Sequence, residues 1–129
     1  NTVKALIATE SGFDPKILAD KKNSNSARGL MQINNQARKI LADEKGELKE
    51  HYVTATKEQL NDPSINICAG IRWLFRKHEI ASRLLKRPAT WEESIAEFKG
   101  VRTTTKARAL ELMKKFNQEL ETLNKCKEP

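Results

Sequence analysis

The sequence predicts a single, mainly α-helical domain spanning all 129 residues. Apolar residues recur at helical spacing in several segments, and helix-capping or helix-ending residues flank those segments. The alternation of β-branched residues that is typical of strands is missing, so we expect little or no β-structure. A chain of 129 residues suits one domain, and its hydrophobic content of 38% is enough to bury a core.

The first half of the chain predicts two helices separated by turns. The first helix is indicated by four residues at i, i+3, i+4 and i+7, namely Val3, Leu6, Ile7 and Glu10. It ends at the Gly-Phe-Asp-Pro segment 12–15. The polar segment Lys21–Ser26 predicts a loop or a short hairpin. The apolar segment Gly29–Ile33 leads into a second helix over about residues 36–43.

A long central helix is predicted to follow Asp62-Pro63, because Asp caps a helix and Pro suits its first position. We expect it to run from Ser64 to about Ala81. Its core-facing residues are predicted to be Ile67, Cys68, Ile71, Leu74 and Phe75, with Ala69, Trp73 and His78 extending the same stripe.

Two further helices complete the prediction. Thr90 and Glu93 match a capping box for a helix that runs through Phe98 and ends at Gly100. The last helix is predicted over about Thr105–Lys125. One stripe of this helix is apolar and contains Ala109, Leu112, Met113, Phe116, Leu120 and Leu123.

Charge and composition narrow the classes of function. Lys and Arg number 24 against 17 Asp and Glu, a net charge of +7 that favours polyanionic partners. The basic residues are scattered, so a nucleic-acid partner is disfavoured. No apolar stretch approaches the roughly 20 residues of a membrane span. His51 and His78 have no partners at metal-ligand spacing, so we expect neither a metal nor a cofactor.

The start and the cysteines of the chain allow two more expectations. Asn1 lies inside the predicted first helix with no signal peptide before it, which suggests a domain cut from a longer protein. A disulfide between Cys68 and Cys126 would tie the last helix to the core in an oxidising compartment. The default expectation is that Cys68 is free and buried.

Glu10 is the most informative single residue, because helical spacing places it on the apolar stripe of Val3, Leu6 and Ile7. A carboxylate that is partly removed from water either pairs with a cation or becomes protonated. A protonated carboxyl group near neutral pH is what a general acid needs. The alternative is structural: Glu10 reaches solvent where the helix ends.

Four motifs in order along the chain resemble the soluble lytic transglycosylase and goose-type lysozyme superfamily. They are Glu10-Ser11-Gly12-Phe13-Asp14-Pro15, Gly29-Leu30-Met31-Gln32-Ile33, Asp62-Pro63-Ser64-Ile65-Asn66-Ile67-Cys68-Ala69-Gly70-Ile71 and Ala96-Glu97-Phe98-Lys99-Gly100. The resemblance covers roughly residues 3–100. It implies a lysozyme-like helical domain with a substrate groove. It also implies a peptidoglycan glycosidase that cleaves the β-1,4 bond between N-acetylmuramic acid and N-acetylglucosamine.

The resemblance assigns the role of general acid/base to Glu10, and several other residues are candidates for substrate binding. Ser11 would hydrogen-bond Glu10 or the substrate, or cap the helix end. Gly29 suits a turn with positive φ or a close approach of the sugar. Gln32 offers an amide for an N-acetyl group. Met31 is either groove wall or core, and Asn66 is either a substrate contact or a structural residue.

The sequence departs from the common family pattern Ala-Tyr-Asn-x-Gly at Phe98 and Lys99. Phe98 keeps the ring but lacks the hydroxyl, and Lys99 replaces a neutral amide with a cation. Lys99 would contact a muramic carboxylate or simply be solvated. These departures leave open an alternative function, a catalytically inactive lysozyme-like module that binds peptidoglycan.

The resemblance allows either a hydrolase or a transglycosylase. A hydrolase commonly holds its water with a second carboxylate, for which Asp20 is the first candidate and Asp14 and Glu97 are weaker ones. A transglycosylase needs only one. The sequence slightly favours the hydrolase, a muramidase. We expect a monomer acting on glycan strands in the periplasm or at the bacterial cell wall, by a delivery route that the sequence does not reveal.

Overall fold

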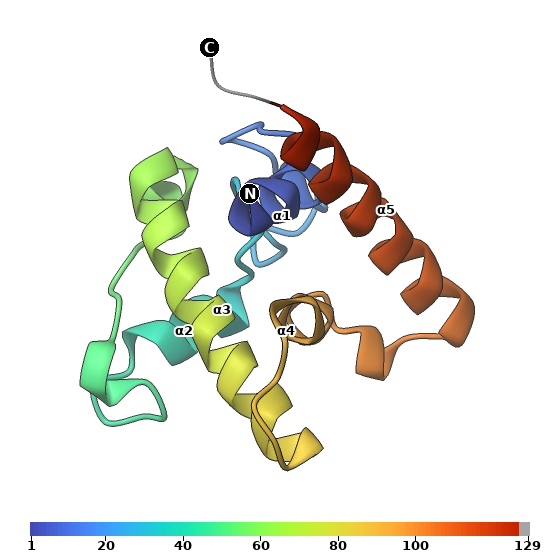
Figure 1. The fold of residues 1–129 in the computed structure, drawn as a ribbon. Coiled ribbons are helices and arrows are strands. Elements are labelled where there is room, and N and C mark those ends of the chain that lie inside the picture. Colours follow the sequence, from blue (N-terminus) through green and yellow to red (C-terminus); the bar gives the residue numbers. More distant parts are fainter. Residues whose placement is uncertain (127–129) are drawn as a thin grey trace. The chain divides into compact units, whose positions relative to one another are not determined.

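The computed structural model describes residues 1–126 and is helical, as predicted (Figure 1). Five α-helices are present among these residues: α1 (Thr2–Ser11), α2 (Asn35–Ala42), α3 (Pro63–Leu85), α4 (Trp91–Phe98) and α5 (Lys106–Lys125). Three short 3₁₀-helices join them: η1 (Lys49–His51), η2 (Glu58–Asn61) and η3 (Val101–Thr103). The described residues contain no strand, only two isolated bridges, Leu18 with Arg28 and Arg28 with Ile33.

The chain divides into two compact units, and the boundaries lie within helices α1 and α3. The Glu10 unit is the continuous stretch Glu10–Trp73. The terminal unit combines Asn1–Thr9 with the chain from Leu74 onward. Within the terminal unit, the Asn1 side chain donates a hydrogen bond to Asn124 Oδ1 over 2.8 Å, which joins the two ends of the described chain. The prediction of one domain stays a prediction.

The Glu10 unit is built from loops, α2 and the first half of α3. Asn34 caps α2 by accepting a hydrogen bond from the Ala37 amide over 2.8 Å. Leu18 pairs with Arg28 in an antiparallel bridge, so the predicted loop Lys21–Ser26 connects two paired residues without forming strands. The buried apolar side chains of this unit are Leu30, Met31, Ile33, Ala37, Leu41, Leu48, Ala55, Leu60 and Ala69.

The start of α3 is as predicted, but its buried face is not. Asp62 Oδ1 accepts a hydrogen bond from the Ile65 amide, and Pro63 is the first helical residue. The helix ends at Leu85, four residues beyond the predicted end. Of the residues on the predicted stripe, Leu74 and Ala69 are buried, whereas Cys68 and Phe75 are exposed. The buried face instead consists of Asn66, Ala69, Gly70, Leu74 and Ala81.

Close packing at Gly70 explains why the buried face of α3 differs from the predicted one. A Cβ atom on Gly70 would collide with the Cβ and Sδ atoms of Met31, so the helix is packed closely at Gly70. Close packing of backbones is strongest where side chains are small. A hydropathy stripe gives little weight to glycine and to the polar Asn66, so it predicts only part of the buried face of α3.

Local capping signals define the terminal unit. Thr90 Oγ1 accepts a hydrogen bond from the Glu93 amide, and the Glu93 carboxylate accepts one from the Thr90 amide, which confirms the predicted capping box. Gly100 ends α4 with φ of 72°. Thr105 caps α5 through the Arg108 amide, and Phe116 is the buried residue of the predicted α5 stripe.

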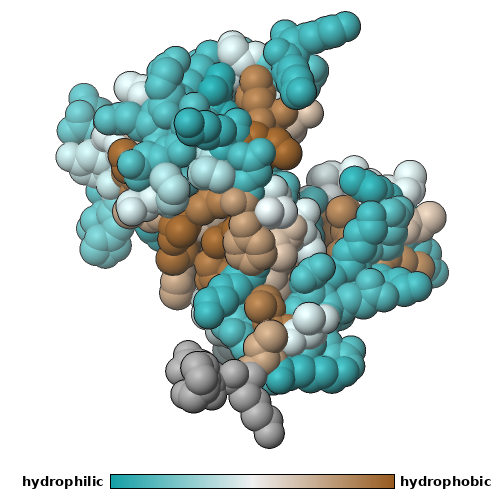
Figure 2. Space-filling model, turned by 90° about the horizontal axis from the view of Figure 1, so that it is seen from above, coloured by the Kyte–Doolittle hydropathy of each residue, from teal (hydrophilic) through white to brown (hydrophobic). Residues whose placement is uncertain are grey.

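The surface is mainly hydrophilic, and apolar residues form patches between the hydrophilic ones on the face in Figure 2. The large exposed apolar residues are Phe13, Ile17, Tyr52, Phe75, Leu84, Leu85, Trp91 and Leu110. Among the described residues, no helix combines the length and hydropathy that a membrane-spanning segment requires.

Candidate active site

Glu10 is the penultimate residue of α1 and is only partly exposed. On the same helix Ala5, Leu6, Ile7 and Ser11 are buried. The predicted apolar stripe therefore exists, and the Glu10 carboxyl group lies at its end, in a setting between core and solvent.

The turn after Glu10 has an unusual backbone. Gly12 and Phe13 both have positive φ, 59° and 65°. The Asp14 amide donates to the Ser11 carbonyl over 3.1 Å, and Asp14 Oδ1 accepts from the Lys16 amide over 3.0 Å. These bonds close the turn immediately after the candidate acid.

Asn66 of α3 organises the loop that contains Gln32. Its Oδ1 accepts a hydrogen bond from the Met31 amide over 2.7 Å. Its Nδ2 donates to the carbonyls of Arg28 and Leu60 over 3.0 and 2.9 Å. The Asn66 side chain is completely buried and uses its amide on three main-chain groups. This supports the structural alternative for Asn66.

Gly29 and Met31 belong to the same packed arrangement. Gly29 has φ of 74°, as the sequence predicted for a turn, and a Cβ atom there would collide with Asn66 Nδ2 and the Leu60 carbonyl. Met31 is fully buried. The burial of Met31 favours its core alternative, and Gly29 is needed because nothing larger fits beside Asn66.

Gln32 also has a left-handed backbone, with φ of 54°. Its Nε2 donates to the Gly29 carbonyl over 3.1 Å and to the Ile17 carbonyl over 3.4 Å. The side chain is partly exposed. Because the donor group serves the loop itself, a contact between Gln32 and a substrate would use the Oε1 acceptor, which matches the N–H of an N-acetyl group.

The three candidate second carboxylates have structural partners. Asp20 is exposed, and its Oδ1 accepts a hydrogen bond from the Lys22 amide over 3.0 Å. Asp14 is used in the turn described above. Glu97 Oε1 forms an ion pair with Arg102 Nη2 over 2.7 Å, and this hydrogen bond, before any other cause, lowers the pKa of the Glu97 carboxyl.

A family model described as Transglycosylase SLT domain matches residues 1–96. The chain belongs to the Transglycosylase SLT domain family. No curated protein and no solved structure matches it. This membership confirms the predicted superfamily, agrees with the helical lysozyme-like fold, and implies a transglycosylase or muramidase that acts on peptidoglycan.

The SLT match covers Glu10, Ser11, Asp20, Gly29, Met31, Gln32 and Asn66, all of which the structure places in the Glu10 unit. Phe98 and Lys99 lie beyond the match and belong to the terminal unit. Phe98 is the partly exposed last residue of α4. Lys99 Nζ donates to Thr9 Oγ1 over 2.8 Å, so Lys99 is not simply solvated.

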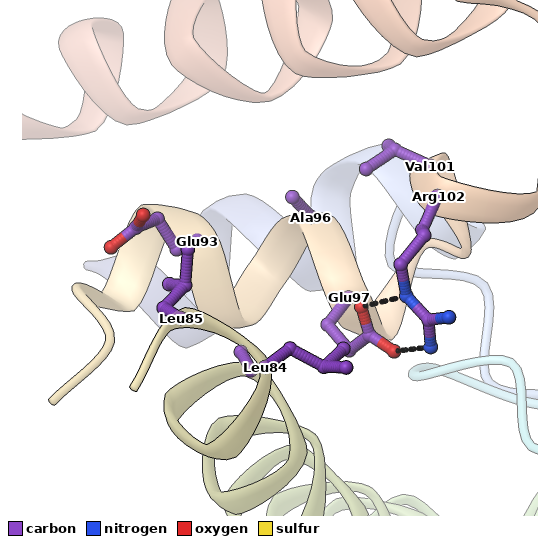
Figure 3. A pocket seen from close by; sticks show the side chains of 8 residues that line it. Leu84, Leu85, Glu93, Ala96, Glu97, Val101 and Arg102 are labelled. Carbon is purple, nitrogen blue, oxygen red and sulfur yellow. Dashed lines mark hydrogen bonds and ion pairs between the residues drawn. The ribbon is translucent and has the colours of Figure 1, made fainter. Parts of the chain in front are cut away.

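A separate cavity of about 200 Å³ lies in the terminal unit of this SLT chain (Figure 3). Ala81, Leu84 and Leu85 come from α3, Glu93, Ala96 and Glu97 from α4, and Val101 and Arg102 from η3. The bidentate Glu97–Arg102 pair is at one side of it. Glu97, a weaker candidate for the second carboxylate, is among the residues that line this cavity.

Cys68 and Cys126 are both free and exposed, so the expectation of a buried Cys68 is wrong. The reason is the rotated buried face of α3, which turns Cys68 outward. In the described residues, no group of three or more His, Cys, Asp or Glu side chains is arranged to hold a metal ion.

Phe13 was not among the sequence-predicted site residues, although it is part of the first SLT motif. Its ring is 55% exposed and its φ is positive. The signal available in the sequence was the turn pattern Gly12-Phe13-Asp14-Pro15, in which an aromatic residue stands at a turn position.

Proposed function

We propose that this SLT domain is a lytic transglycosylase that cleaves the β-1,4 bond between N-acetylmuramic acid and N-acetylglucosamine. The carrying observation is the half-buried Glu10, which lies in one compact unit with the rigid Gly29–Gln32 loop. The family acts on peptidoglycan, which supports glycan strands as the substrate. We propose that the domain acts as a monomer in the periplasm or at the bacterial cell wall.

In the proposed reaction, Glu10 works first as an acid and then as a base. The protonated carboxyl group gives its proton to the bridging oxygen, the bond from that oxygen to C1 of the muramic residue breaks, and the leaving sugar departs with a 4-hydroxyl group. The resulting Glu10 carboxylate takes the proton from the muramic 6-hydroxyl group while the oxygen of that hydroxyl group attacks C1. The product is a 1,6-anhydro ring, and no water is consumed.

The hydrogen-bonding of the other acidic residues supports transglycosylation over the hydrolysis that the sequence slightly favoured. Hydrolysis commonly uses a second carboxylate to hold the attacking water. Asp20 and Asp14 serve main-chain amides in turns, and Glu97 is paired with Arg102. Transglycosylation requires only Glu10.

Mass spectrometry of digested peptidoglycan tests the proposal. We expect muropeptides that end in 1,6-anhydromuramic acid, which are lighter by one water than the products of a hydrolase. Reducing muramic ends would show a muramidase instead and would return attention to Asp20 as the second carboxylate.

The alternative is a peptidoglycan-binding module without turnover. Phe98, which lacks the tyrosine hydroxyl, and Lys99, whose ammonium group is bonded to Thr9, favour it. Such a module would bind purified peptidoglycan and release neither anhydro nor reducing muropeptides. Its Glu10→Gln variant would bind peptidoglycan as well as the wild-type protein does.

A further inference from the structure

Two non-glycine residues of the Glu10 unit have a strained backbone. Phe13 and Gln32 are the non-glycine residues of the Glu10 unit with positive φ, and Gly12 and Gly29 accompany them. A left-handed conformation is unfavourable for a residue with a Cβ atom and a ring. Such strained residues cluster at ligand-binding and active sites, where function compensates for the strain.

Neither burial nor hydrogen bonding explains the aromatic residue at position 13. The Phe13 ring is 55% exposed, so its transfer from water contributes little to folding. The bonds that close the turn join the Asp14 amide to the Ser11 carbonyl and the Lys16 amide to Asp14 Oδ1. None of these bonds uses the Phe13 side chain, and glycine would satisfy the same backbone without strain.

The loop of Phe13 is tied directly to the loop of Gln32. The Ile17 carbonyl accepts hydrogen bonds from the Gly29 amide over 2.9 Å and from Gln32 Nε2 over 3.4 Å. Ile17 is itself exposed. An exposed ring, an exposed aliphatic side chain and an amide side chain therefore stand on two connected loops, within the unit that begins with Glu10.

We propose that Phe13 is a sugar-binding residue whose ring stacks on the C–H face of a pyranose in the glycan strand. A pyranose is polar at its rim and apolar on its C–H face, so it complements a flat exposed ring and a hydrogen-bonding amide on two connected loops. The inference rests on the proposed function for its ligand class, and it adds a residue that binds the glycan without taking part in proton transfer.

Phe13→Gly separates binding from folding, because glycine accepts φ of 65° more readily than phenylalanine. The matched control is Tyr52→Ala, which removes another exposed ring of the same unit from an ordinary backbone with φ of −71°. Both substitutions are made in the wild-type protein and in Glu10→Gln. The probe is purified glycan strands freed of their stem peptides.

We expect Phe13→Gly to keep or raise the thermal midpoint. In the Glu10→Gln background it should weaken glycan binding about tenfold, which corresponds to about 1.4 kcal/mol and lies near the upper end of the range for an aromatic stacking contact. Tyr52→Ala should leave binding unchanged. In the otherwise wild-type protein, KM for the strands should rise by the same factor with little change in kcat.

Two results would overturn the inference. One is unchanged glycan binding in Phe13→Gly. The other is a large fall in its thermal midpoint, which would make the ring a structural element. Binding is measured with Glu10→Gln and therefore does not need turnover. If Phe13→Gly leaves binding unchanged but the wild-type protein releases muropeptides, only the inference about Phe13 fails. If Phe13→Gly weakens binding but the wild-type protein releases no muropeptides, only the catalytic proposal fails.

Discussion

The two units of the chain are stabilised by different kinds of interaction. In the Glu10 unit, the fully buried Asn66 side chain joins three main-chain groups, and Gly29 and Met31 pack around it. In the terminal unit, the polar interactions include helix caps and ion pairs such as Arg87–Glu93. They also include single hydrogen bonds at buried or part-buried side chains, such as the one between His78 Nδ1 and the buried Ser94 Oγ over 2.7 Å. Buried polar networks are costly to disrupt, whereas exposed ion pairs contribute about 0–1 kcal/mol each.

The two units also differ in net charge. The Glu10 unit contains 10 Lys and Arg against 9 Asp and Glu, a net charge of +1. The terminal unit contains 14 against 8, a net charge of +6. The positive charge of the chain therefore lies mainly in the terminal unit, whereas Glu10 lies in a unit that is nearly neutral.

The largest effect is expected from Asn66→Ala, which would leave the Met31 amide and the Arg28 and Leu60 carbonyls without their buried partner. An unsatisfied buried polar group costs about 1–3 kcal/mol, so we expect a loss of about 4 kcal/mol in the free energy of unfolding. Denaturant titration measures it. The control is Asn117→Ala in the terminal unit, whose exposed side chain donates only to Glu92. Equal small losses in both variants would erase the contrast between the units.

The next effect compares two glycines of the Glu10 unit. Gly29→Ala and Gly12→Ala both place a Cβ atom on a left-handed backbone, which costs about 1–2 kcal/mol. Only at Gly29 does that atom also collide with Asn66 and the Leu60 carbonyl, because nothing lies within 4 Å of the position at Gly12. We therefore expect Gly29→Ala to lose about 3 kcal/mol and Gly12→Ala about 1 kcal/mol in denaturant titrations. Equal losses of stability in the two variants would show that Asn66 and the Leu60 carbonyl move aside readily for the added Cβ atom.

In the terminal unit, Thr90→Ala removes the side-chain half of the α4 capping box. A lost cap costs about 1 kcal/mol, clearly less than either change at the Asn66 arrangement. Thr90→Ser keeps the hydroxyl and should be close to wild type. The thermal midpoints of the two variants measure the difference, and a Thr90→Ala loss as large as that of Asn66→Ala would contradict the ranking.

The smallest effect depends on pH. Hydrogen bonds from Arg87, and secondly from the Thr90 amide, lower the pKa of the Glu93 carboxyl from 4.5 to about 2. Because the pKa is lower in the folded than in the unfolded state, this contact stabilises fully above about pH 4.5. Its contribution disappears as the pH falls from about 4.5 to about 2.

Glu93→Gln should therefore approach the wild-type thermal midpoint as the pH falls through this window. The comparison requires thermal melts of both proteins at matched ionic strength, because exposed charge pairs are screened by salt. A constant difference between the two curves across the window would contradict the contribution assigned to the Glu93 carboxylate.

Sequence reasoning succeeded where the interactions are local. The Thr90–Glu93 box and the Asp62-Pro63 helix start involve residues one to three positions apart, and both are confirmed. It failed on part of the buried face of α3, because Asn66 is polar and Gly70 has no side chain, so hydropathy gives neither residue weight. The bonds of Asn66 reach residues 35 and 38 positions away, so only the folded chain reveals them.

In the candidate site, too, the sequence reveals local features and the structure is needed for the long-range ones. Glu10 could be selected from its place on a helical stripe, because that pattern lies within ten residues. The sequence left a structural role and a substrate contact open for Asn66, because its partners depend on long-range packing. It did not select Phe13, because the strain there depends on a backbone angle. The partners of Asp20 and Lys99 likewise came only from the folded structure.

The most direct test of the account is the rate at which Glu10→Gln releases soluble muropeptides from purified peptidoglycan, measured beside its helical content. Gln keeps the size of the side chain and removes the proton that the bridging oxygen needs. We expect unchanged helicity and a rate at least about 100-fold lower, the minimum typical of a lost general acid. A variant that releases muropeptides at the wild-type rate would show that Glu10 does not perform the chemistry.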